Sequence, residues 1–174
     1  MSCLTTYSPE FTDLIVSNDN FSGVVTGFAE GTFLSVEPFE DRMTAVYGAK
    51  GESYRAVSAV KAFDLTVTLS QTSRWNDIFT LLLRNDRDTL EGTFNVTLKD
   101  SSGTTIFTDR CAYIGTEPTQ AFSGGGTIEG REWQIHLPNP EGYMIGGNSR
   151  FTPEQRDAVE ALGGTVPEQW QPQD

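Results

Sequence analysis

Side chains that carry catalysis or bind transition metals are scarce in this sequence, and their spacing suits neither task. The chain has one histidine, His136, and two cysteines, Cys3 and Cys111. Transition-metal sites place His and Cys at short spacings such as CxxC or HExxH, and the sequence contains neither pattern. Because His136 lies between the apolar residues Ile135 and Leu137, we interpret it as a solvated strand histidine and expect no metal site.

Two short segments begin like ligand-binding loops but lack the residues that complete them. "NDNFSG" at 18–23 starts like a calcium loop, yet the twelfth position, which needs a bidentate acid, is Ala29. "GGG" at 124–126 lacks the Lys and Ser/Thr of a phosphate-binding loop. Carboxylates are numerous, but no pair stands out as general acid and base. The sequence therefore predicts no catalytic residue, no metal ligand, no cofactor and no enzymatic activity.

The charge balance argues against a partner held through its phosphates. Twelve Lys and Arg stand against 24 Asp and Glu, a formal net charge of −12, whereas nucleic-acid binders neutralise phosphates with basic side chains. No stretch approaches the roughly 18 apolar residues of a membrane span, and the start lacks signal-peptide features. We expect a soluble cytoplasmic product with reduced thiols, in which Cys111 packs beside Ala112 and Tyr113.

The alternation of apolar and polar residues along the chain predicts a mainly β fold. Residues 63–70 alternate between apolar and polar, which is typical of a strand with one face in the core and one in water. The alternation recurs over 94–99 and 132–137, residues 101–103 predict a hairpin turn into 104–115, and residues 23–39 predict two strands joined near 29–31. The polar face of the first of these strands carries Asp64, Thr66, Thr68 and Ser70.

An amphipathic helix follows that strand after four polar residues. Ser73 is a suitable N-cap, and the segment "NDRD" predicts a helix end near residues 84–85. Four apolar side chains at i, i+3, i+4 and i+7 form one stripe, so we expect the helix to cover the core side of the sheet. The stripe consists of Trp75, Ile78, Phe79 and Leu82.

Residues 37–61 mix charged, small and apolar side chains around two glycines. A connection of this length is uncommon in a compact domain and is usually functional. We interpret it as a protruding hairpin or loop. The alternative is two further strands of a sandwich, because "MTAVYG" and "SYRAVS" are both able to pair.

Residues 139–174 form an extension beyond a β domain of residues 1–138. Thr152 as N-cap and Gln155 as its capping-box partner predict a short helix from Pro153 to Leu162, stopped by Gly163. Its apolar stripe is too small for independent stability, so the helix either docks on the outside of the domain or is a tethered appendage. Residues 165–174 are expected to be poorly ordered unless they dock.

Several segments appear in a characteristic order: "EDRMTAVYGAKGES", then "VTLSQTSRWND" after an alternating strand, then "LKDSSGTTIFTDRCAYI" and "REWQIHL". In order and character the span 21–137 resembles the tail tube proteins of contractile-tailed bacteriophages, which are related in fold to secretion-system tube proteins. The motifs that carry the resemblance are structural rather than catalytic. The residues from 138 onward extend past the core of that family.

The resemblance implies a β-sandwich or barrel subunit with a flanking helix, six of which form rings that stack into the inner tube of the virion tail. It implies further copies, tail sheath, baseplate and tail terminator proteins as partners, with assembly in the host cytoplasm and no membrane span. DNA would pass through an acidic or neutral lumen without specific binding. Strand 63–70, which lacks edge protection, would pair with a neighbouring subunit.

The same resemblance assigns roles to candidate residues. The lumen-facing candidates are Asp64, Thr66, Thr68 and Ser70. The inter-ring arm candidates are Arg42, Met43, Val46, Tyr47 and Tyr54. The helix residues that pack on the core are Trp75, Ile78, Phe79 and Leu82.

The alternative from another class is a soluble β-sandwich binding module, or a baseplate or receptor-binding component. Exposed aromatic side chains at Tyr47, Tyr143 and Trp170 would favour it, unless these simply pack. Assembly separates the two hypotheses, because a tube subunit forms rings or tubes whereas a module binds its ligand as a small oligomer.

Overall fold

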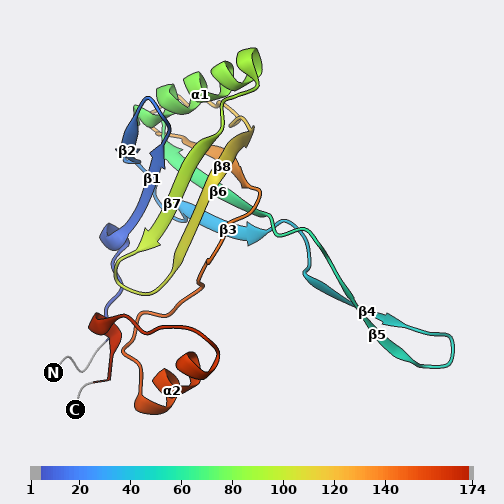
Figure 1. The fold of residues 1–174 in the computed structure, drawn as a ribbon. Coiled ribbons are helices and arrows are strands. Elements are labelled where there is room, and N and C mark those ends of the chain that lie inside the picture. Colours follow the sequence, from blue (N-terminus) through green and yellow to red (C-terminus); the bar gives the residue numbers. More distant parts are fainter. Residues whose placement is uncertain (1–4, 173–174) are drawn as a thin grey trace.

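A computed structural model describes residues 5–172, in which one antiparallel sheet organises the fold. The strands are β1 (Thr12–Ser17), β2 (Ser22–Val24), β3 (Leu34–Pro38), β4 (Met43–Tyr47), β5 (Ser53–Val57), β6 (Phe63–Ser70), β7 (Phe94–Asp100), β8 (Ile106–Thr116) and β9 (Gly130–Leu137). The helices are α1 (Trp75–Thr89) and α2 (Pro153–Ala161), with short 3-10 turns η1 (Pro9–Phe11) and η2 (Glu168–Trp170). Seven strands lie in the order β2-β1-β7-β8-β9-β6-β3, and β4 and β5 form a separate two-stranded sheet (Figure 1). The expected mainly β fold is confirmed, with no closed barrel in the described residues.

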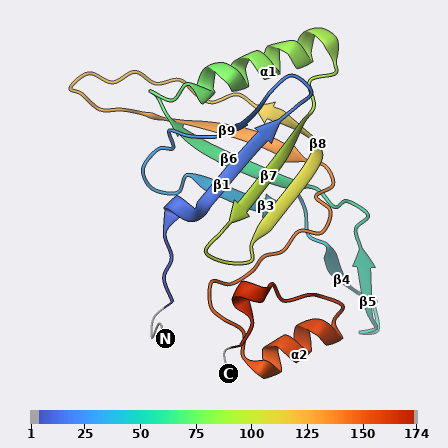
Figure 2. The same ribbon diagram turned by 60° about the vertical axis from the view of Figure 1, so that its left-hand side comes forward.

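The sheet folds over at β8, and its two halves enclose one hydrophobic core. The first residues of β8 pair with β7 and its last residues pair with β9. In Figure 2, β1 and β7 cross β6 and β3 instead of continuing in one plane. Leu14 and Val96 from one half and Leu65 and Ile135 from the other are fully buried in the same cluster. Burying each such side chain contributes a free energy of about 1.5–3 kcal/mol, which stabilises the packing of the two halves on each other.

Strand β6 has the alternation that its sequence predicts, since its four apolar residues are buried and its four polar residues are half-buried. The expectation that this strand pairs with a neighbouring subunit is wrong. β3 occupies one of its edges and β9 the other. An inner strand has no free edge to protect, which explains its lack of protective residues. The terminal strands of the sheet are β2 and β3.

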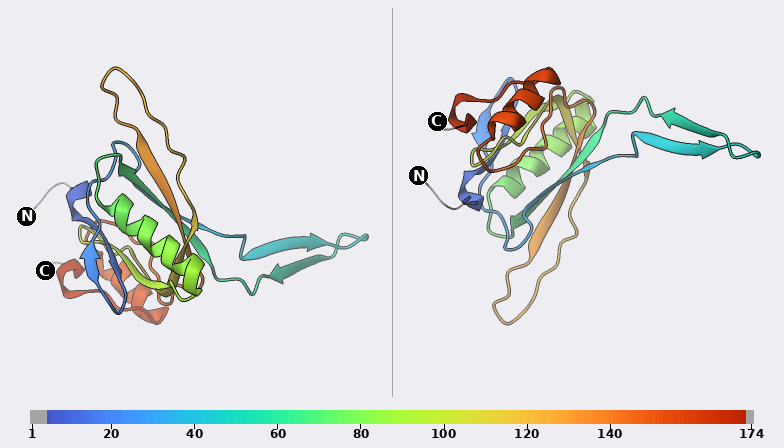
Figure 3. Two further views of the ribbon diagram at one scale, coloured as in Figure 1. Left: turned by 90° about the horizontal axis from the view of Figure 1, so that it is seen from above. Right: turned by 90° about the horizontal axis from the view of Figure 1, so that it is seen from below.

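Helix α1 lies across one end of the folded sheet (Figures 1 and 3). With Ser73 as N-cap the helix would begin at Arg74, but it begins one residue later, at Trp75. Arg74 is therefore the N-cap, and its side chain makes no capping hydrogen bond. The Ser73 hydroxyl still accepts from the backbone N–H of Trp75 at 3.3 Å and donates to the carbonyl of Thr26 at 2.7 Å. Ser73 therefore joins the helix start to the segment after β2.

The predicted end of this helix near residues 84–85 is wrong, because α1 continues to Thr89. The polar residues after Leu83 extend the helix with Asn85, Arg87 and Asp88 exposed to solvent. Leu90 then ends it in a left-handed conformation, with φ 59°, and its N–H donates to the carbonyl of Asp86 at 2.7 Å. Glycine usually occupies such a position, which is why the sequence did not mark the end here.

The predicted hairpin around residues 101–103 is confirmed, because β7 and β8 pair on either side of that turn. The two strands expected within residues 23–39 are β2 and β3, which lie at opposite ends of the sheet. Strand β1 was not predicted, although it is the partner of both β2 and β7.

A bulge in β8 overturns the expected packing of Cys111, which is exposed. The register of β8 against β7 shifts in this region. As a result, the consecutive residues Arg110 and Cys111 are both exposed to solvent, while Asp109 before them and Ala112 after them are buried. The Asp109 carboxylate accepts from the N–H of Cys111 at 2.7 Å and from the N–H of Asn139 at 2.8 Å. The buried acid thus fixes the bulge and the start of the extension. Cys3 lies outside the described residues.

The extension packs on the β7–β8 turn of its own chain. Met144 forms a bridge with Ile106, and the side-chain amide of Asn148 donates to Asp100 at 3.1 Å. The predicted capping box is present at the start of α2, where Thr152 and Gln155 each bond the other's backbone N–H. The helix ends at Ala161 instead of Leu162 and has no fully buried residue.

The segment after α2, expected to be poorly ordered unless docked, lies against the extension. Val166 is buried, and the N–H of Phe151 donates to the carbonyl of Trp170 at 3.1 Å. The last two residues, 173–174, lie outside the described part of the chain.

Candidate functional site

The most exposed feature of the fold is a hairpin formed by β4 and β5, which we call the arm (residues 43–57). It projects far from the sheet in Figures 1 and 3, and all ten strand residues are exposed. The interpretation of residues 37–61 as a protruding hairpin agrees with this arrangement, and the alternative of two more sandwich strands does not. Gly51, at φ +88°, supplies the conformation that the tight turn between the strands requires.

Both faces of the arm carry apolar side chains. Met43 pairs with Val57, and Val46 pairs with Tyr54 three residues further along the strand. Because side chains alternate along a strand, these two pairs lie on opposite faces. Tyr47, on the face of Met43, has 70% of its surface exposed. The sequence analysis named four of these five residues. It missed Val57, which the strand register places opposite Met43.

The remaining arm candidate, Arg42, lies at the root of the arm. Its guanidinium donates to the carbonyls of Val60 and Lys61, the latter at 2.8 Å, and lies 5.2 Å from the ring centre of Phe63. The carbonyl of Arg42 accepts from the N–H of Ser58 at 2.9 Å. Arg42 therefore fixes the direction in which the arm leaves the sheet, and the apolar residues further out form its contact surface.

The four polar residues of β6 belong to a wider outward face on β3, β6 and β9, which we call the polar face. The register places Ser35 and Glu37 beside Thr66 and Asp64 on one side. On the other side of β6, the β9 residues His136, Gln134 and Glu132 lie beside Asp64, Thr66 and Thr68. On these strands, which the structure describes completely, the face has three carboxylates and no Lys or Arg. Its members are Ser35, Glu37, Asp64, Thr66, Thr68, Ser70, Glu132, Gln134 and His136.

His136 is a strand histidine of this face, but it is half-buried. Its Nδ1 lies 2.7 Å from the Oδ1 of Asp64, its partner on β6. The rings of Phe39 and Tyr113 lie 5.4 and 5.2 Å from the imidazole, centre to centre. One candidate residue, Asp64, is therefore held by His136, whose imidazole the two aromatic rings enclose. Ser70 is similarly occupied, since its hydroxyl is 3.0 Å from that of Thr72.

Helix α1 closes one end of the core that the apolar side of β6 helps to form. Trp75, Phe79 and Leu82 are buried, and Ile78 is half-buried against the same core. The ring centre of Phe79 lies 5.7 Å from that of Trp75 and 5.5 Å from that of Trp133 on β9. These aromatic contacts join the helix to β9, the strand next to β6.

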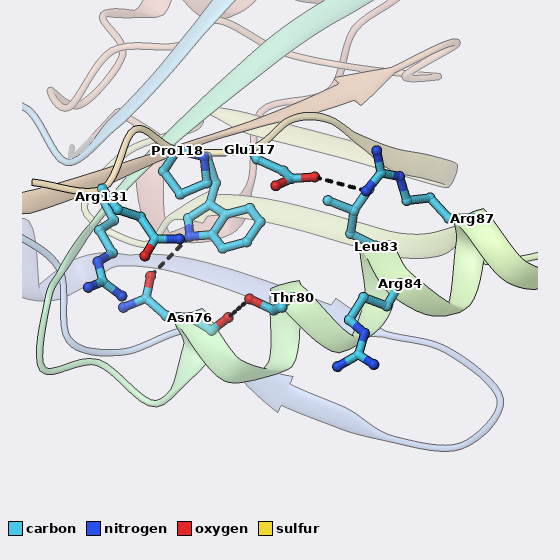
Figure 4. A pocket seen from close by; sticks show the side chains of 10 residues that line it. Asn76, Thr80, Leu83, Arg84, Arg87, Glu117, Pro118 and Arg131 are labelled. Atoms are coloured by element: carbon cyan, nitrogen blue, oxygen red, sulfur yellow. Dashed lines mark hydrogen bonds and ion pairs between the residues drawn. The ribbon is translucent and has the colours of Figure 1, made fainter.

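A polar cavity of about 350 Å³ lies between α1 and the start of the β8–β9 loop (Figure 4). Asn76 forms one wall by accepting from the indole N–H of Trp133 at 3.0 Å. Arg87 at its rim pairs with Glu117 at 3.4 Å, and both side chains are largely exposed. The lining has no nucleophile paired with a base, so we assign it no chemistry.

The described residues contain no group of three or more His, Cys, Asp or Glu side chains arranged to hold a metal ion. Within the same part of the chain, no helix is long and apolar enough to cross a membrane. Of the aromatic residues proposed for ligand binding, Tyr143 packs on Phe63 and stacks on Phe107.

The fold is a folded antiparallel sheet with an exposed arm, and comparison with known proteins gives the family of the chain. Over 170 residues, or 95% of this chain and 96% of the relative, the sequence is 32% identical to "Structural protein ORF10" of Pseudomonas phage KPP10. The chain belongs to the family of that phage structural protein.

Two other comparisons add little. No protein-family model matches the chain. A solved structure, the anti-feeding prophage cap described as a tube terminating cap, aligns with 80% of this chain and 93% of its own length at a TM-score of 0.43 and 8% identity. Similarity at that level carries no argument about function.

Proposed function

We propose that this protein is the subunit of the inner tube of a contractile phage tail, with six copies in each ring and the rings stacked into a tube. The observation that carries the proposal is the arm, which is exposed along its whole length and apolar on both faces. A lone two-stranded hairpin is marginally stable in water, and a contiguous exposed apolar surface marks a contact with another molecule. Membership of a phage structural protein family supports other virion proteins as that contact.

In this proposal the arm reaches the next ring. Its root at Arg42 fixes its direction, and its apolar side chains contact the adjacent subunits. Within a ring, the terminal strands β2 and β3 provide the edges that neighbouring copies can use, because β6 is paired on both sides.

The polar face lines the lumen in the same proposal. Short hydroxyl side chains with three carboxylates and no Lys or Arg suit a channel through which DNA slides, because they offer phosphates no permanently cationic partner. The DNA is therefore a transient passenger during ejection. The role is structural and not catalytic.

Residues 1–138 form the tube-building domain in this proposal, and residues 139–174 form an extension that meets other tail components. Tail sheath, baseplate and terminator proteins are the expected further partners. Assembly takes place in the host cytoplasm, and the product is located in the tail of the virion.

Electron microscopy of the purified protein tests the proposal. Wild-type protein is expected to form six-membered rings or hollow tubes, and a variant lacking residues 43–57 is expected to remain folded without forming tubes. Far-UV circular dichroism and the urea midpoint of both proteins check the folding. Normal tubes from the variant would rule out the arm as the inter-ring contact, whereas a wild-type protein that stays a small oligomer would favour a binding module or baseplate component.

A further inference from the structure

The extension and the β7–β8 turn enclose an apolar groove of about 560 Å³. Backbone bonds hold its two sides together, since the N–H of Thr104 donates to the carbonyl of Gly147 at 3.2 Å and Met144 exchanges two bonds with Ile106. The groove is thus built into the fold. Its lining includes Thr104, Ile106, Met144, Ile145, Phe151 and Trp170.

Two of these residues indicate that the groove is incomplete in a single chain. Ile145 keeps 73% of its surface exposed although it lies in an apolar lining. The indole Nε1 of Trp170 is buried, and no described residue accepts its hydrogen bond. Buried donors without an acceptor are rare in folded proteins and costly. An occupant with an apolar body would cover Ile145, and an acceptor on it would satisfy Trp170 when binding turns the indole toward the groove.

We propose that the groove receives the tip of the arm from a second copy of this chain, an inference that rests on the proposed function and names the surface that the arm contacts. The arm carries Tyr47 near its tip, and this side chain combines an aromatic ring with a hydroxyl that can accept from Trp170. The arm of the same chain points away from the extension in Figures 1 and 3. The occupant is therefore another copy.

The charges of the two segments are complementary. The arm has two basic side chains, Lys50 and Arg55, and one acid, Glu52, so it is positive in a protein with a net charge of −12. The described part of the extension, residues 139–172, has five acids and two arginines. Among the described residues that line the groove, Lys99 is the only charged one, so the attraction acts between the two segments as wholes and favours their encounter.

Disulfide cross-linking between two differently tagged copies tests the contact directly. Both copies carry Cys3→Ser and Cys111→Ser, one adds Ala49→Cys at the arm tip, and the other adds Gln169→Cys, an exposed residue of the groove lining. The matched control replaces Gln169→Cys with Leu162→Cys, which is 88% exposed in the same extension and is not part of the lining. The groove pair is expected to cross-link at least about tenfold more than the control, because a disulfide needs Cα atoms within roughly 7 Å.

Charge substitutions test whether assembly needs the contact. Ile145→Lys in the groove and Tyr47→Asp on the arm are expected to abolish tube formation. Leu162→Lys and Tyr7→Asp, the same changes at exposed positions elsewhere, are expected to preserve it. Because all four positions are exposed, the variants should fold like the wild type.

The outcomes separate this inference from the proposed function. One outcome would overturn the inference and leave the tube proposal intact. In it, the protein forms tubes, the groove pair cross-links no more than the control pair, and Ile145→Lys assembles normally. Loss of sheath attachment by Ile145→Lys, with normal tubes, would also overturn it by giving the groove a different occupant. Specific cross-linking in a protein that forms only small oligomers would support the inference and reject the tube.

Discussion

Asp64 and His136 face each other across β6 and β9, with the carboxylate Oδ1 2.7 Å from the imidazole Nδ1. Phe39 and Tyr113 enclose the same imidazole. The polar face is therefore partly fixed by contacts within the chain and is not a row of freely solvated side chains. Asp64 is thus both the partner of His136 and a candidate for the lumen surface.

Replacing Asp64→Ala is expected to lower the free energy of unfolding by about 0.5–1.5 kcal/mol, the usual net contribution of a hydrogen bond. Urea denaturation of Asp64→Ala, His136→Ala and the double variant measures how much of this loss comes from the pair. A double variant whose loss equals the sum of the two single losses would show that the residues do not stabilise each other.

Replacing Asp64→Lys is expected to slow DNA ejection while tubes still form. If the polar face lines the lumen, the change adds one positive charge per subunit and gives passing phosphates a partner. The ejection rate of phage carrying the variant measures the effect, which should weaken at higher salt. Asp64→Asn is the control, since it removes the acid without adding a base, and equal rates for both variants would place Asp64 away from the DNA.

Phe79→Ala is expected to lower the free energy of unfolding by about 3–5 kcal/mol, because the side chain is fully buried between Trp75 and Trp133. Leu81→Ala is its control on the exposed side of α1 and should change stability by less than about 0.5 kcal/mol. Urea denaturation gives both values. Similar losses for the two variants would contradict the orientation of α1.

Leu90→Gly is expected to stabilise the protein by about 0.5–1 kcal/mol. Leu90 ends α1 with φ 59°, a conformation that costs a residue with a Cβ roughly 1–2 kcal/mol, and its exposed side chain gives little in return. Leu81→Gly, in the exposed interior of the same helix, should instead destabilise by about 1 kcal/mol. Opposite shifts of the urea midpoint for the two variants are the expected result.

Local patterns predict the elements that their own residues determine. The alternation of β6 and the stripe of Trp75 and Phe79 each depend on positions a few residues apart, and the capping box at Thr152 spans three residues. These features could therefore be predicted from sequence. Strand β1 was missed because Leu14, Ile15 and Val16 are consecutive apolar residues and conceal the alternation.

Features that depend on distant partners could not be predicted in this way. Nothing within β6 indicates that β3 and β9 occupy its edges, which led to the wrong expectation of an intersubunit strand. The exposure of Cys111 follows from a bulge fixed by Asp109, and its immediate neighbours do not reveal it. The groove similarly joins the extension to the β7–β8 turn some 40 residues earlier, as the bond between Thr105 and Gly146 shows.

Two truncations of the extension separate its structural contribution from its proposed role in assembly. Ending the chain after Pro140 removes Tyr143, whose ring stacks on Phe107, and Asn148, which bonds Asp100. We expect the free energy of unfolding to fall by about 2 kcal/mol or more. Ending it after Ser149 keeps these contacts and removes α2, which has no fully buried residue, together with the buried Val166, so the loss should be smaller than that of the shorter chain.

Assembly of the longer truncation is the informative measurement, because that protein should fold normally while it lacks Trp170 and Phe151 from the groove. If the groove receives the arm, the chain ending at Ser149 forms no tubes although a cooperative urea transition shows that it remains folded. Addition of salt to the full-length protein should likewise weaken assembly, since the acidic extension and the basic arm attract each other less when screened. Tubes and sheath attachment that both persist without residues 150–174 would mean that this part of the extension has no role in assembly.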